Sequence, residues 1–197
     1  MRRTLFRRAF SLAAIGALCA GASHEGLAAP KKAPLGTAGE PNEARATSES
    51  NLSDGQILGV VNAASDGEIA LSSLASSKAE SEPVRQLALL ILKDHGADKE
   101  QSRQLATKLR IKPAPSSVGS AIQKQSDDLL GHLEKSGALD FDRLYVESQV
   151  RFLQRLEQVL GELLPQTEAR ELKALVTDMH GQAEHHLAVA RGTLANH

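Results

Sequence analysis

Residues 140–164, DFDRLYVESQVRFLQRLEQVLGELL, decide the fold, and Pro165 follows them directly. Apolar residues recur in this stretch at intervals of three and four, the spacing that brings side chains to one face of an α-helix. Proline ends the pattern because it lacks the N–H that a continuing helix needs. The stretch therefore predicts a long amphipathic helix that buries one face.

The same spacing recurs along the chain and predicts three more long helices and a shorter one. Aromatic residues make up 3% of the sequence, which disfavours β-sandwiches and barrels. Short turns join the first long helix to the second and the third to the fourth, so each pair should be antiparallel. We predict an all-α, up-down four-helix bundle with a short extra helix before the third long helix. The predicted helices span residues 54–78, 82–109, 118–135, 140–164 and 167–195.

The amino-terminal residues 1–29 have the pattern of a signal peptide. Four arginines precede an uncharged, small-residue stretch over residues 9–22, and cleavage after Ala22 or Ala29 fits the preference of signal peptidase for small residues. The only cysteine, Cys19, lies inside this segment. We expect a periplasmic or secreted protein, exported by the general secretory or the twin-arginine route, without a transmembrane anchor after cleavage.

Residues 30–52 contain almost no large apolar side chain, so we predict a disordered linker there and a folded domain over residues 53–195. The formal net charge of the chain is −1, and no zinc-finger, Walker or dinucleotide-binding spacing occurs. Nucleic acid is therefore not an expected partner. With no cysteine after residue 29 and no Gly-x-Ser-x-Gly motif, cysteine or serine catalysis finds no support; whether the protein is an enzyme stays open, with a non-enzyme favoured.

Each long helix carries a polar residue in its otherwise apolar inner face. Glu68 and His95 lie about equally far from the first short turn, which predicts that they meet in the bundle core. One interpretation is a site for a single transition-metal ion, because a buried carboxylate needs a cation or another polar partner. The other is a hydrogen-bonded layer that sets the register of the helices. The metal interpretation takes Glu68, His95 and His186 as ligands, with Asp98 and Tyr145 as weaker candidates for ligands or supporting groups.

Other histidines and carboxylates do not enter this core site. The chain lacks the paired Glu-x-x-His motifs of di-iron bundles, so the pattern supports one ion at most. By helical phase, His180 and His185 lie away from the inner face and are expected on the surface. Glu147 is expected to face solvent for the same reason.

The order and spacing of several short motifs resemble the DUF4142 family over residues 53–195. These motifs are Asp66-Gly67-Glu68-Ile69-Ala70 with Leu74-Ala75, Val84-Arg85-Gln86-Leu87-Ala88 with Lys93-Asp94-His95, Phe141-Asp142 with Tyr145 and Gln149-Val150, and His186-Leu187 with Ala190.

The resemblance implies an exported bacterial protein with a ferritin-like four-helix bundle, and it places the family pattern on Glu68, His95, Tyr145 and His186. Leu153 stands where many members have a further histidine, so one family ligand candidate is absent here. The function expected from residues and resemblance together is a cell-envelope protein that binds a metal ion in the bundle, with a role in stress protection that rests on the family alone. The alternative is a structural or interaction module that meets another envelope protein.

Overall fold

The computed structural model describes residues 51–195. The predicted signal peptide and residues 30–50 of the predicted linker lie outside the described residues. Residue Leu52, which we assigned to the linker, belongs to the folded domain instead. Its side chain is buried in the core, and its backbone N–H donates a hydrogen bond of 2.8 Å to Oε1 of Gln166.

The described chain is all-α, as predicted, and no strand occurs within residues 51–195. Its helices begin and end within a few residues of the predicted positions. They are α1 (Asp54–Lys78), α2 (Glu82–Leu109), α3 (Ser117–Lys135), α4 (Ala138–Leu163) and α5 (Arg170–Ala195), with a short 3-10 helix, η1 (Leu164–Gln166), after α4.

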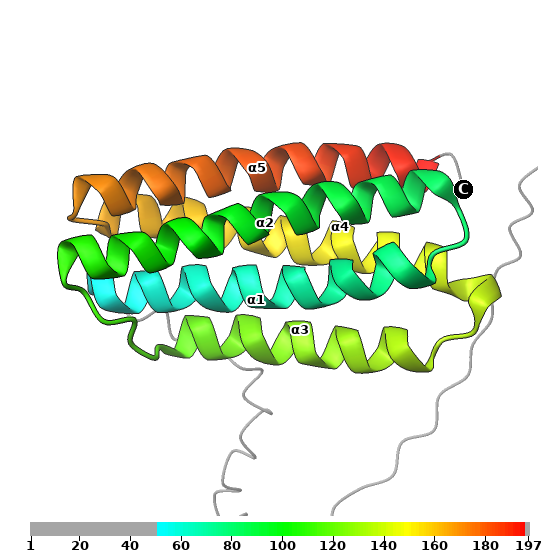
Figure 1. Cartoon of the computed structure of the whole chain (residues 1–197), viewed down its shortest axis with the longest axis horizontal. Coiled ribbons are helices and arrows are strands. Elements are labelled where there is room, and N and C mark those ends of the chain that lie inside the picture. The colour runs from blue at the N-terminus through cyan, green and yellow to red at the C-terminus, as the bar shows by residue number, and fades with distance from the viewer. Residues whose placement is uncertain (1–50, 196–197) are drawn as a thin grey trace, which may run out of the picture. The chain divides into compact units, whose positions relative to one another are not determined.

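The four long helices run alongside one another around a common core, and α3 lies along the outer side of α1 (Figure 1). Helix α1 packs against α2, and α4 packs against α5; α2 also contacts α5, and α1 contacts α4. The residues that recur at intervals of three and four on the inner faces of the long helices are buried. Leu109, the last such residue of α2, is partly buried. None of the helices in residues 51–195 is long and apolar enough to cross a membrane.

Glycines on α1 let the segment before α3, and α3 itself, approach closely. The backbone N–H of Ala114 donates a hydrogen bond of 2.8 Å to the carbonyl oxygen of Gly55. A β-carbon on Gly59 would overlap with the carbonyl oxygen of Ala114, and one on Gly67 would lie 2.6 Å from Ser126. The connection between the helix pairs therefore rests directly on the backbone of α1.

Carboxylates from other helices hold the two short turns. Asp54 on α1 accepts hydrogen bonds from the N–H groups of Glu168 and Ala169, just before α5. Asp142 on α4 accepts from the N–H groups of Glu80 and Ser81, just before α2. Each carboxylate satisfies backbone donors that the start of a helix leaves without partners.

The start of α4 differs from our prediction. The predicted helix over residues 140–164 begins two residues earlier, at Ala138, and its capping residue Gly137 makes no side-chain hydrogen bond. Asp140 lies in the first turn, where its carboxylate is 3.7 Å from Arg143. A carboxylate is also favourable there, because the N-terminal end of a helix carries partial positive charge.

Candidate functional site

Five of the buried polar side chains lie at the boundary between two apolar clusters of the core. On α1, α2 and α5, residues of one cluster precede these side chains and residues of the other follow them; on α4, both clusters contribute residues after Gln149. We call this group the polar layer, and it consists of Glu68 on α1, His95 and Asp98 on α2, Gln149 on α4 and His186 on α5. Because all four long helices contribute, the layer crosses the whole bundle.

Glu68 is fully buried on α1, between Ala64 and Leu71 of the two clusters. Its Oε2 atom accepts a hydrogen bond of 3.0 Å from Nε2 of Gln149, whereas Oε1 has no partner among the described residues. Burial raises the pKa of Glu68 to about 8, and the bond from Gln149 opposes this only in part. At neutral pH the carboxyl group is therefore largely protonated unless a cation stabilises its charge.

His95 is fully buried on α2 and makes no hydrogen bond through either ring nitrogen within the described part of the chain. Its Nδ1 atom lies 3.6 Å from Oδ2 of Asp98, too far for a good hydrogen bond. Burial, with a smaller contribution from the nearby His186, lowers the pKa of His95 to about 3. The imidazole is therefore neutral, and one of its nitrogens carries a free lone pair.

His186 is fully buried on α5, and Asp94 on α2 fixes its orientation. The Nε2 atom of His186 lies 2.9 Å from Oδ2 of Asp94, whereas Nδ1 has no partner among residues 51–195. An ionised carboxylate only accepts hydrogen bonds, so Nε2 carries the proton and Nδ1 carries the lone pair. The rings of His186 and His95 are 5.8 Å apart between centroids. The two imidazoles thus lie together in the core, and the Nδ1 lone pair of His186 is free.

Two further residue pairs complete the surroundings. Gln182 on α5 donates a hydrogen bond of 3.3 Å to Oδ1 of Asp98, and burial raises the pKa of Asp98 to about 6. The hydroxyl groups of Tyr145 and Ser72 are 3.1 Å apart, and burial raises the pKa of Tyr145, with Glu68 adding to the effect. Tyr145 therefore remains a neutral phenol beside the layer.

The structure buries every residue that the sequence assigned to the core site, but one predicted contact is wrong. Glu68 and His95 do not bond to each other, since Glu68 pairs with Gln149 and His95 has no hydrogen-bond partner in the described chain. The ligand atoms of Glu68, His95 and His186 also do not all lie within 4.8 Å of one another; among residues 51–195 this criterion is met by Glu157, His180 and Glu184.

Sequence reasoning missed Asp94 as the partner of His186 and Gln182 as the partner of Asp98. Asp94 precedes His95 and has no helical-phase signal, because it lies beside the inner face and reaches α5 with its side chain. Gln149 stood on the predicted inner face, but its bond to Glu68 was not predicted. Glu147 is half-buried rather than fully solvent-facing, and it pairs with Arg143 at 3.0 Å.

Comparisons with curated proteins and with solved structures find no significant match. A protein-family model, described as a domain of unknown function (DUF4142), matches residues 38–193. The match includes all five helices up to the last turn of α5, and all residues of the polar layer lie within it. The chain therefore belongs to the DUF4142 family.

Proposed function

We propose that this protein is an exported helical-bundle protein, related to the ferritin-like bundles, that binds one divalent transition-metal ion in its polar layer. His186, His95 and Glu68 are the ligands we assign, and side-chain rotation has to bring their ligand atoms closer together, since these do not all lie within 4.8 Å of one another. The observation that carries the proposal is the set of buried, unpartnered acceptor atoms: Nδ1 of His186, a nitrogen of His95 and Oε1 of Glu68. Export rests on the pattern of residues 1–29.

The energetics favour a ligand at this position. A buried polar atom without a hydrogen-bond partner costs about 1–3 kcal/mol, and three such atoms from three helices occur in one layer. A cation in the layer would use these lone pairs and would stabilise Glu68 in its ionised form. Binding would thus offset the free-energy cost of burying these three atoms without hydrogen-bond partners.

The contact between Asp94 and His186 supports metal binding in particular. Metal-binding histidines commonly donate their second ring N–H to a carboxylate, which fixes the tautomer and makes the other nitrogen a better ligand. His186 has this arrangement, with Nε2 bonded to Asp94 and Nδ1 free. Two imidazoles and one carboxylate suit zinc, iron, copper or nickel better than magnesium or calcium.

A register-setting layer without metal is the second candidate function, and it also has a specific observation in its favour. Hydrogen bonds link α1 to α4 through Glu68 and Gln149, α2 to α5 through Asp94 and His186, and α1 to α4 again through Ser72 and Tyr145. Such bonds require one axial alignment of the helices. None of these hydrogen bonds involves His95, whose two ring nitrogens have no hydrogen-bond partner in the described chain.

Thermal unfolding with and without metal separates the two functions. Untagged protein is stripped of metal with a chelator and titrated with Zn²⁺, Co²⁺ or Ni²⁺. We expect the wild type to gain about 2.7 kcal/mol of unfolding free energy when free metal exceeds Kd a hundredfold. His186→Ala should lose the part of the gain that belongs to the core site, and Asp94→Asn should weaken binding by about tenfold or more.

His132→Ala is the matched control, because His132 is an exposed histidine on α3, away from the core. It should gain as much stability from metal as the wild type. If His186→Ala and Asp94→Asn respond to every metal as His132→Ala does, the core binds no ion and the register function stands.

A further inference from the structure

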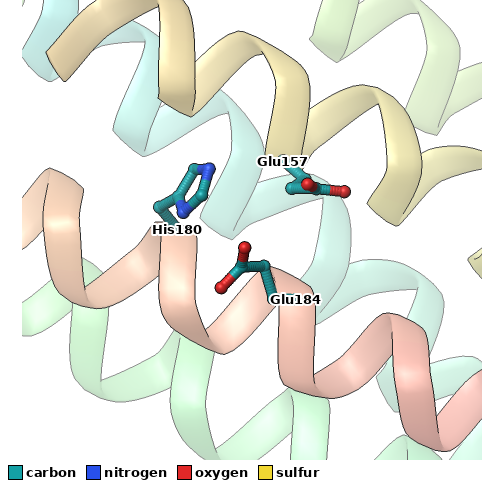
Figure 2. Close-up of side chains that lie close together, drawn as sticks. All are labelled: Glu157, His180 and Glu184. Carbon is teal, nitrogen blue, oxygen red and sulfur yellow. The ribbon is translucent and has the colours of Figure 1, made fainter.

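A second group of metal-binding side chains lies on α4 and α5, apart from the polar layer. Glu157 projects from α4, and His180 and Glu184 project from α5 toward it (Figure 2). One ligand atom from each residue lies within 4.8 Å of the other two. Glu157 and His180 are partly buried and Glu184 is exposed, so solvent ions have access to the group. His180, which we expect on the surface from its helical phase, is partly buried in the structure.

The helical geometry brings these three side chains together. His180 and Glu184 are four residues apart on α5, so they share one face of that helix. Gly161 lies four residues after Glu157 on the facing side of α4. A β-carbon on Gly161 would lie 3.4 Å from Nε2 of His180, at van der Waals contact, so the imidazole packs against this part of α4. The ring is thereby held between the two helices, beside both carboxylates.

The group has acidic charge without a basic partner. None of the ion pairs within residues 51–195 involves Glu157 or Glu184. Two other carboxylates of these helices do have a basic partner: Glu147 pairs with Arg143 at 3.0 Å, and Glu171 pairs with Lys108 at 3.1 Å. Two unpaired carboxylates this close repel each other, and a dication between them would remove the repulsion.

We propose that Glu157, His180 and Glu184 form a second, solvent-accessible site for a divalent transition-metal ion of the zinc class. One imidazole nitrogen and two carboxylate oxygens are ligands that Zn²⁺ takes at about 2.0–2.2 Å. Tetrahedral ligands at that bond length are roughly 3.4 Å apart, so small side-chain rotations bring the three atoms into place. Three protein ligands leave a coordination position for water, and the ion at this site exchanges with solvent more readily than one in the core.

The test measures Zn²⁺ binding by isothermal titration calorimetry and equilibrium dialysis on the untagged chain carrying His186→Ala, which lacks a ligand of the core site. We expect one ion per chain in this background. Adding His180→Ala or Glu184→Gln should weaken its binding by about tenfold or more, because each change removes one of three ligands. Neither residue is fully buried, and circular dichroism should show unchanged helix content.

His132→Ala and Glu134→Gln on α3 are matched controls, since both remove exposed groups of the same types outside the cluster. They should leave the affinity unchanged. The proposal is overturned if the His186→Ala chain binds no Zn²⁺ at millimolar concentration, or if His180→Ala and Glu184→Gln bind as tightly as the controls. If His180→Ala lowers binding in the wild-type chain while His186→Ala does not, the surface site stands and the core site is wrong.

Discussion

Asp94 and His186 join α2 to α5 through a contact of 2.9 Å between Oδ2 and Nε2, and the residue next to Asp94 is His95. One turn of α2 therefore orients one imidazole through Asp94 and supplies the second imidazole itself. The rings face each other at a centroid distance of 5.8 Å with 55° between their planes. A shift of α2 against α5 would therefore change both the contact between Asp94 and His186 and the separation of the two imidazoles.

Replacing His95 with Leu should stabilise the metal-free protein. Both nitrogens of His95 are buried without hydrogen-bond partners in the described chain, and leucine fills a similar volume with apolar atoms. We expect the unfolding free energy to rise by about 1–3 kcal/mol in the presence of a chelator, measured by urea denaturation. A loss of stability would mean that His95 has a stabilising partner in the metal-free state.

Glu68 should make the metal-free protein less stable as pH rises through neutrality. Its pKa is 4.5 in a model peptide and about 8 in the folded state, so the folded state holds the proton more tightly. The resulting stabilisation is full below pH 4.5 and is lost as pH rises to 8. His95 acts in the opposite sense below pH 6.5, because its pKa falls from 6.5 to about 3 on folding. Asp98, with a pKa of about 6, has lost most of its proton by pH 6.5, so Glu68 dominates the pH dependence above that value.

Glu68→Gln tests this pH dependence, because glutamine keeps the size of the side chain and does not ionise. Between pH 6.5 and 8 the wild type should lose about 2 kcal/mol of unfolding free energy relative to Glu68→Gln. Urea denaturation at a series of pH values, with chelator present, measures the difference. Glu134→Gln removes an exposed carboxylate and should follow the wild type; parallel curves for Glu68→Gln and the wild type would contradict the raised pKa.

Asp142→Ala should destabilise the turn between α1 and α2. It removes the acceptor of two backbone N–H groups, those of Glu80 and Ser81. We expect a loss of about 1–3 kcal/mol, measured by thermal or urea unfolding. Asp140→Ala, two residues away, removes an exposed carboxylate and should change stability by less than about 1 kcal/mol. Equal effects of the two substitutions would show that the hydrogen bonds from Asp142 contribute little.

Gly59→Ala should destabilise the contact between α1 and the segment before α3. A β-carbon at this position overlaps with the backbone oxygen of Ala114, so the segment must move. We expect a loss of about 1–3 kcal/mol. Gly131→Ala is the control, because a β-carbon on Gly131 meets nothing within 4 Å and alanine favours the helix by about 1 kcal/mol. If both substitutions stabilise the protein, the backbone of Ala114 does not lie close enough to Gly59 to exclude a β-carbon.

The helices and their buried faces could be predicted from sequence because both follow from local spacing. Glu68, His95 and His186 could be predicted from this spacing, because each is an ionisable residue at an inner-face position of an otherwise apolar helix face. The bond between Asp94 and His186 was not, because it depends on how far α2 lies from α5 and on the rotation of each helix. Spacing along one helix does not contain that information.

The group of Glu157, His180 and Glu184 was also only partly predictable, because spacing along one helix places two of its members and helix packing places the third. His180 and Glu184 stand four residues apart, which places them on one face of a helix. Glu157 joins them only through the relative offset of α4 and α5, which depends on the turn through η1 and on the packing of apolar side chains. The shared face of His180 and Glu184 therefore follows from the sequence spacing, whereas the position of Glu157 beside them does not.

The division of the apolar core into two clusters has a consequence for the way the domain opens. Each half of the bundle holds its own apolar cluster, and the halves are joined by the continuous helices and by the polar layer. Amide hydrogen exchange would then occur in two cooperative units, one on each side of residues 68, 95, 149 and 186, with separate opening free energies. An ion held at the junction would couple the two units, so that the bundle opens as one.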